Sequence, residues 1–132
     1  MTRFAIGAPT AIQLARESVT VAEAHQLVAP SLLHSEALSI LYGQVRAGNL
    51  DRKEALEMLD RITTMRIRLL GDRVSRATAW KIAEKLDWPG IRDAEYLAVA
   101  QLQADAFVTV DNALAGRAEG IVPRAPWESL LR

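Results

Sequence analysis

Short apolar runs alternate with amphipathic stretches along this chain of 132 residues, and that alternation constrains the fold more than any other feature. The apolar runs have the length of strands, and the stretches between them repeat their apolar residues at helical spacing. Short strands separated by helices form a parallel sheet that is covered on both faces. The sequence therefore predicts an α/β fold with a short central parallel sheet, and it places any ligand beyond the carboxyl ends of the strands.

The expected elements follow from this reading, and no linker long enough to divide residues 1–132 into two domains is present. Ser31 and Asp72 are expected to cap the helices that follow them. The predicted strands are residues 3–6, 27–30, 67–70, 106–110 and 121–122. The predicted helices are residues 10–17, 20–26, 31–47, 49–65, 74–86, 93–103, 112–117 and 127–131.

Composition excludes several functional classes. Half of the residues are apolar (50%) and 24% are charged, as in a soluble globular protein. The 16 Lys and Arg residues balance 16 Asp and Glu residues, so overall charge points to neither nucleic acid nor membrane. Cysteine is absent, which excludes disulfides and thiol catalysis and fits a reducing cytoplasm. No transmembrane segment or signal peptide is expected.

Glu36 is the first of three carboxylates in unexpected places. It lies in the predicted helix 31–47 at helical spacing from Leu32, Leu33 and Ile40, which form the buried stripe. A buried carboxylate without a partner is unfavourable, so a cation, a hydrogen-bond donor or a metal ion is expected beside it. The alternative is an edge position where the carboxylate reaches water or an arginine.

Asp93 and Asp111 are the other two, and each begins a helix. Taken alone, each is explained as a cap or as a first-turn acid that interacts with the helix dipole. Asp111, however, directly follows the buried strand "FVTV", where ligands collect in a parallel sheet. Thr109 is expected on the same side as Asp111 if the strand geometry continues. Arg92, beside Asp93, is expected to pair with an acid or to approach a phosphate.

Together the three acids predict an acidic pocket at one edge of the sheet. Clustered carboxylates repel one another, and a hard cation such as Mg²⁺ or Mn²⁺ relieves that repulsion. Such a site activates water and stabilises the transition state of phosphodiester hydrolysis.

Two segments carry a resemblance to a known family. "RDAEYLAVAQLQADAFVTVDNALA" (residues 92–115) and "LVAPSLLHSEALSILY" (residues 27–42) resemble the PIN-domain family, especially the VapC-type toxin ribonucleases of toxin–antitoxin pairs. The resemblance implies a three-layer α/β/α fold in a single domain. It also implies Mg²⁺- or Mn²⁺-dependent RNA cleavage, an antitoxin protein as partner, and a homodimer.

The same resemblance implies which residues act. Glu36, Asp93 and Asp111 match three of the metal-binding acids of the family, and Thr109 matches the accompanying hydroxyl. The first acid of the family ends the first strand, and in "IGAPTAI" that place is held by Gly7. A neutral hydroxyl at Thr10 is a poor replacement for it, and Glu95 faces roughly away from Asp93 on the same helix.

Two functions from different classes remain open. One is a metal-dependent endoribonuclease that uses three acids instead of four; the other is a non-catalytic module that binds RNA or protein, which Gly7 favours. A small-molecule α/β enzyme is less well supported, because the sequence has no glycine-rich phosphate loop and no nucleophile motif.

Overall fold

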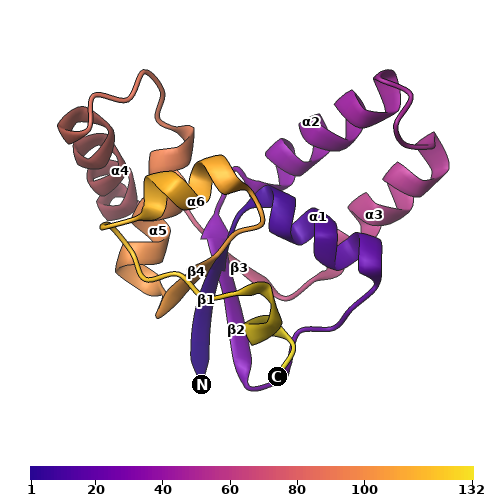
Figure 1. Cartoon of the computed structure of the whole chain (residues 1–132), viewed down its shortest axis with the longest axis horizontal. Helices are drawn as coiled ribbons and strands as arrows, with labels where there is room; N and C mark the ends of the chain where they lie inside the picture. Colours follow the sequence, from indigo (N-terminus) through magenta and orange to yellow (C-terminus); the bar gives the residue numbers. More distant parts are fainter.

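A four-stranded parallel sheet forms the centre of the computed structural model, which describes all residues from Met1 to Arg132. The strands lie in the order β3-β2-β1-β4 (Figure 1). Their bounds are β1 Thr2–Ile6, β2 His25–Pro30, β3 Ile67–Leu70 and β4 Ala106–Val108. The predicted α/β class, with a short parallel sheet between helical layers, is confirmed.

The register brings the carboxyl ends of the strands to one edge of the sheet. Ile6 pairs with Val108, and Pro30 pairs with Leu70. The loops that follow these strands therefore open on the same side, where ligands bind in sheets of this type.

Helices cover both faces of the sheet. In Figure 1, α1, α2 and α3 lie on one side and pack on one another, and α4 and α5 pack together on the other side. Not one of the helices combines the length and the apolar character that a membrane crossing requires. The bounds are α1 Ala8–Glu17, α2 Leu33–Arg46, α3 Arg52–Thr64, α4 Arg73–Lys85, α5 Arg92–Gln103, α6 Asn112–Ala118 and the 3₁₀ helix η1 Trp127–Leu130.

Small residues allow α4 and α5 to approach each other closely. Ala79 and Ala83 of α4 pack against Ala94 and Ala98 of α5, and all four are buried. The same α5 also packs against β1 and β2. Two surfaces therefore fix the first turn of α5, which carries Asp93.

The two predicted helix caps have different outcomes. Asp72 caps α4 as predicted, because its Oδ1 accepts a hydrogen bond from the Ser75 N–H at 2.8 Å. The prediction for Ser31 is wrong: α2 begins at Leu33, with Leu32 at the N-cap and no side-chain cap. The Ser35 hydroxyl bonds instead to the Leu32 carbonyl oxygen at 3.1 Å.

The predicted helix 20–26 is wrong, because β2 already begins at His25. Pairing of His25 with Thr2 extends the sheet into this segment. The imidazole ring also packs edge-on against Phe4, with ring centroids 4.9 Å apart. Tertiary pairing thus overrides the local helical preference.

The predicted strand 121–122 is also wrong. The backbone N–H groups of Ile121 and Val122 both bond to the Ala118 carbonyl, so these residues continue the turn after α6. Only an isolated bridge between Phe107 and Arg124 extends the sheet beyond β4. The strand β4 itself ends at Val108, two residues before the predicted end at residue 110.

Candidate functional site

Glu36 of α2 and Asp93 of α5 meet around one guanidinium group at the carboxyl edge of the sheet. The Arg92 Nε lies 3.1 Å from Glu36 Oε2 and 3.7 Å from Asp93 Oδ1. The side chains of the two acids are 14% and 21% exposed, whereas Arg92 is 66% exposed. Two acids predicted from the sequence therefore come together from opposite helical layers, with a partly open cation between them.

Tyr96 orients the Glu36 carboxylate from within the core. Its side chain is only 2% exposed, and its hydroxyl donates a hydrogen bond to Glu36 Oε1. Burial and the hydrogen bond to Glu36 both raise the pKa of Tyr96. Tyr96 therefore stays neutral and remains a donor. The sequence carried a signal for this role, because Tyr96 follows Asp93 by three positions and so shares its helix face.

Arg117 of α6 holds the other acid. Its Nη1 lies 2.8 Å from Asp93 Oδ2. The same guanidinium stacks over the Trp88 ring, 4.5 Å from its centroid, a contact that attracts a cation to the aromatic face. Each acid of the pair is thus neutralised by an arginine.

Asp111 acts as the N-cap of α6. Its Oδ1 accepts a hydrogen bond from the Ala113 N–H at 2.9 Å. Its own N–H donates to Thr109 Oγ1 at 3.1 Å, so the two residues share a tight turn after β4. In this structure no group of three or more His, Cys, Asp or Glu side chains is placed to hold a metal ion. The structure therefore joins Glu36 and Asp93, but no third acid completes a metal-binding group with them.

Gly7 lies at the N-cap of α1, at the end of β1. Its backbone, with φ −96° and ψ 173°, is one that any residue adopts. A Cβ added there would lie 3.7 Å from both Leu114 Cδ2 and Pro9 Cδ, which is ordinary van der Waals contact. The position therefore has room for a Cβ.

Thr10 does not replace the missing acid. It is fully buried, and its hydroxyl donates to the Val108 carbonyl oxygen at 3.1 Å. This bond ties α1 to the end of β4 across the sheet edge. The hydroxyl proton is therefore already used in a structural hydrogen bond.

The donor set at this edge fits one mode of divalent-cation binding. Mg²⁺ usually keeps several waters and takes one or two protein carboxylates together with substrate phosphates. Arg92 Nε occupies a position from which a positive charge contacts both Glu36 and Asp93. The pair suits a water-rich, two-carboxylate Mg²⁺ or Mn²⁺ site, and it does not form a closed cage of protein ligands.

Comparison with known proteins gives a structural likeness. No family model matches the chain. The search of curated proteins likewise returns no match. The fold resembles the crystal structure of PAE2754 from Pyrobaculum aerophilum, with a TM-score of 0.76, over 98% of this chain and 93% of that one. At 22% sequence identity, this likeness supports the fold alone.

Proposed function

We propose that this protein is a metal-dependent endoribonuclease of the PIN type, acting in the cytoplasm, and that Glu36 and Asp93 hold Mg²⁺ or Mn²⁺ beside the scissile phosphate. One observation carries the proposal: two carboxylates from opposite helical layers meet around a single cationic nitrogen at the carboxyl edge of the sheet. Arg92 supplies the positive charge between the two acids in this structure, and a divalent cation would take the same place when Arg92 moves away. The resemblance of residues 27–42 and 92–115 to PIN-domain ribonucleases agrees with this proposal.

The metal ion would supply Lewis-acid stabilisation of the phosphate and a water of lowered pKa. The chain itself supplies orientation. Tyr96 holds Glu36 Oε1, so Oε2 is left facing the position shared with Asp93. Trp88 and Asp93 together hold the guanidinium of Arg117 at the rim, where a phosphate oxygen is a competing acceptor.

Arg92 is the residue that must move when an ion binds. Its side chain is 66% exposed, and exposed ion pairs contribute only about 0–1 kcal/mol. Release from Glu36 is therefore easy. An arginine beside the reacting centre then has a phosphate of the RNA backbone as its natural partner.

Cleavage of a labelled single-stranded RNA in Mn²⁺ tests the proposal. We expect Glu36→Gln and Asp93→Asn to lose at least about tenfold in rate, since each removes one charge from the pair. Asp60→Asn, on the exposed surface of α3, is the matched control and should keep the wild-type rate. If wild type and Asp93→Asn cleave equally slowly, the catalytic proposal fails.

Asp111 has its own discriminating variant. Asparagine also caps helices well, so Asp111→Asn keeps α6 and removes only the charge. A rate loss that matches that of Asp93→Asn would place Asp111 with the bound ion. An unchanged rate would leave it as a cap.

A second candidate is a non-catalytic module of the same fold that binds RNA or a protein, and Gly7 favours it. The strand end that would carry a fourth acid has space for a Cβ but holds none. Gly7→Asp separates the two candidates. A large gain in cleavage indicates an enzyme that lacks one ligand, whereas cleavage absent from both forms, with RNA binding retained, indicates the module.

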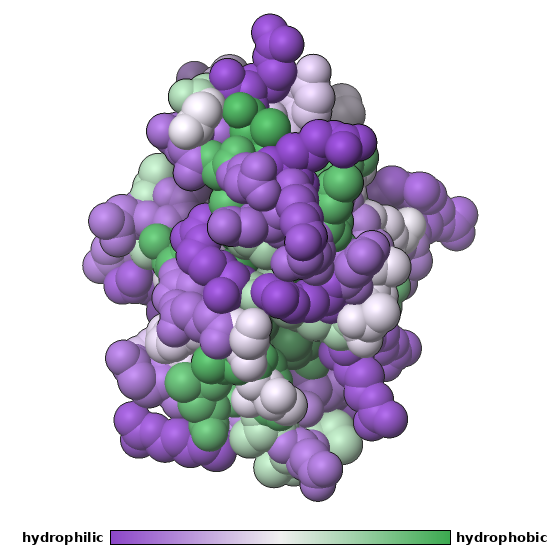
Figure 2. Space-filling view, turned by 90° about the vertical axis from the view of Figure 1, so that its right-hand side faces the viewer, coloured by the Kyte–Doolittle hydropathy of each residue, from purple (hydrophilic) through white to green (hydrophobic).

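We further propose that α2 and α3 carry the surface for an antitoxin protein or a second copy of the chain. These helices project from the body of the molecule (Figure 1) and expose Leu38, Tyr42 and Leu56 at 54%, 65% and 47%. Figure 2 looks onto this end and shows hydrophobic residues in patches among hydrophilic ones. The molar mass in solution, measured by light scattering for wild type and Tyr42→Ser, tests whether this surface binds a second copy of the chain.

A further inference from the structure

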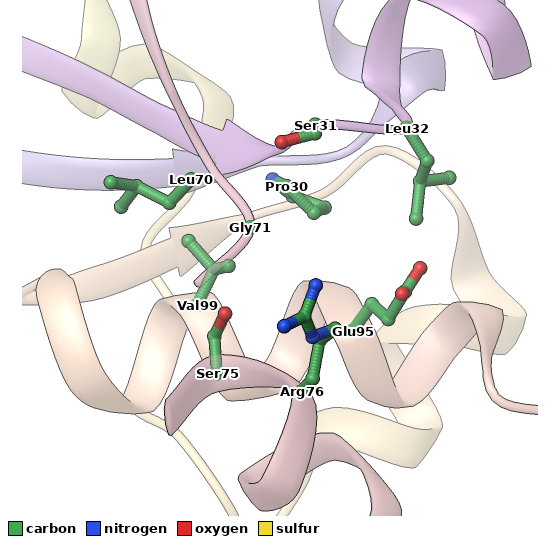
Figure 3. Close-up of a pocket in the computed structure, with 9 residues that line it drawn as sticks. All are labelled: Pro30, Ser31, Leu32, Leu70, Gly71, Ser75, Arg76, Glu95 and Val99. Carbon is green, nitrogen blue, oxygen red and sulfur yellow. The ribbon is translucent and has the colours of Figure 1, made fainter. Parts of the chain in front are cut away.

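A cavity of about 260 Å³ lies at the carboxyl ends of β2 and β3 (Figure 3). Pro30 and Ser31, at the end of β2, form one wall, and α4 and α5 form the other through Arg76 and Glu95. Glu95 follows Asp93 by two positions on α5. The cavity therefore lies at the same carboxyl edge of the sheet as the acid pair, and different side chains form it.

Two charged side chains, Glu95 and Arg76, line the cavity. Glu95 and Arg76 take part in none of the ion pairs or side-chain hydrogen bonds of the chain. Figure 3 shows the Arg76 guanidinium in the space between the two walls, and the Glu95 side chain extends from α5 toward Leu32 on the other side of it.

The walls of the cavity also have an apolar part. Val99 and Pro30 are buried and give an apolar lining. Gly71 allows the Ser31 side chain to approach closely on the β3 side, because a Cβ there would lie 2.5 Å from Ser31 Oγ. The Ser31 hydroxyl makes no hydrogen bond within the protein and is free for a ligand.

We propose that this cavity binds a guanine base of the RNA next to the cleaved phosphate, a proposal that rests on the ribonuclease function above. Guanine presents two adjacent donors, N1–H and N2–H, which a carboxylate accepts as a pair, and its O6 accepts from a guanidinium. Glu95 and Arg76 provide this combination. No other RNA base offers two neighbouring donors on its Watson–Crick edge, and single-stranded RNA leaves that edge open for recognition.

Binding measured without metal tests the base pocket independently of cleavage. In EDTA, we would titrate the protein with pentanucleotide RNAs that differ only in the central base within a uridine context, and follow fluorescence anisotropy. We expect the guanine oligonucleotide to bind about tenfold or more tightly than those with adenine, cytosine or uracil, the scale of a bidentate base contact. Inosine, which lacks the N2 amino group, should fall between guanine and the rest.

Variants assign the preference to the cavity. Glu95→Gln should abolish the guanine preference, because an amide cannot accept from both donors. Arg76→Ala should reduce it. Glu57→Gln and Arg52→Ala, on exposed positions of α3, are the matched controls and should keep it.

The outcomes separate this inference from the proposed function. Equal binding of all four oligonucleotides, or a guanine preference that survives Glu95→Gln, overturns the pocket whether or not the protein cleaves RNA. A Glu95-dependent guanine preference in a protein that shows no metal-dependent cleavage keeps the pocket and overturns the ribonuclease.

Discussion

The Tyr96 hydroxyl donates a hydrogen bond to Glu36 Oε1, although the two residues are 60 positions apart. Tyr96 comes from α5, on one side of the sheet, and Glu36 from α2, on the other. The bond therefore links the two helical layers across the carboxyl edge of the sheet, and it leaves only one oxygen of Glu36 free for a cation.

Tyr96→Phe should destabilise the fold by about 1–3 kcal/mol, the range for a hydrogen bond to a charged group. Because the pKa of Tyr96 is raised in the folded state, the contribution of its hydroxyl is complete below the ordinary value of 10.0. It is lost as the pH rises above that value, since the unfolded chain ionises first. Urea unfolding of wild type and Tyr96→Phe at neutral pH and above pH 10.0 measures this difference, which should shrink at the higher pH.

Gly7→Asp should fold and should acquire a metal-dependent gain in stability. The added Cβ has space, and a third carboxylate at the edge should repel Glu36 and Asp93 until a cation binds. We expect Mn²⁺ to raise the melting temperature of Gly7→Asp more than that of wild type, by mass action. Gly7→Asn is the uncharged control. Equal shifts for the aspartate and asparagine variants would argue against a carboxylate site at this edge.

Arg92→Ala should bind Mn²⁺ more tightly than wild type, because it removes a cation that competes for the same two carboxylates. Its effect on folding stability should be small, since the Arg92 side chain is itself 66% exposed. Calorimetric titration with Mn²⁺ measures the affinity, and Arg46→Ala, at the exposed end of α2, serves as the control. Weaker binding by Arg92→Ala would contradict the competition.

Asp72→Ala should destabilise α4 at neutral pH through loss of the N-cap. Hydrogen bonds from Ser75 lower the pKa of Asp72. Its contribution is therefore complete above the ordinary value of 3.8 and is lost as the pH falls through the lowered value. The stability difference between wild type and Asp72→Ala should accordingly narrow in acid, as measured by urea unfolding across that range.

The sequence predicts most of the sheet because its strand signals are local. Phe107 and Val108 belong to an unbroken apolar run, and such runs report burial directly. The prediction of a helix at residues 20–26 is wrong because the signal there is not local. The strand conformation of His25 depends on pairing with Thr2, far away in the chain. Local spacing contains no information about that partner.

The candidate site likewise has a part that the sequence predicts and a part that it does not. The meeting of Glu36 and Asp93 follows from their positions on helices that flank a parallel sheet. Arg117 was not predicted, since its contact with Asp93 spans 24 residues and depends on where α6 packs. The expected alignment of Thr109 with Asp111 assumed a strand that continues, and β4 ends at Val108.

The turn at Gly7 has an evolutionary consequence. Thr10 holds the start of α1 to β4 through its own hydroxyl, so the shape of the turn does not depend on the residue at position 7. A glycine codon that ends in a pyrimidine becomes an aspartate codon through a change of its middle base. From such a codon, one mutational step would add a carboxylate at this edge, with the surrounding scaffold already in place.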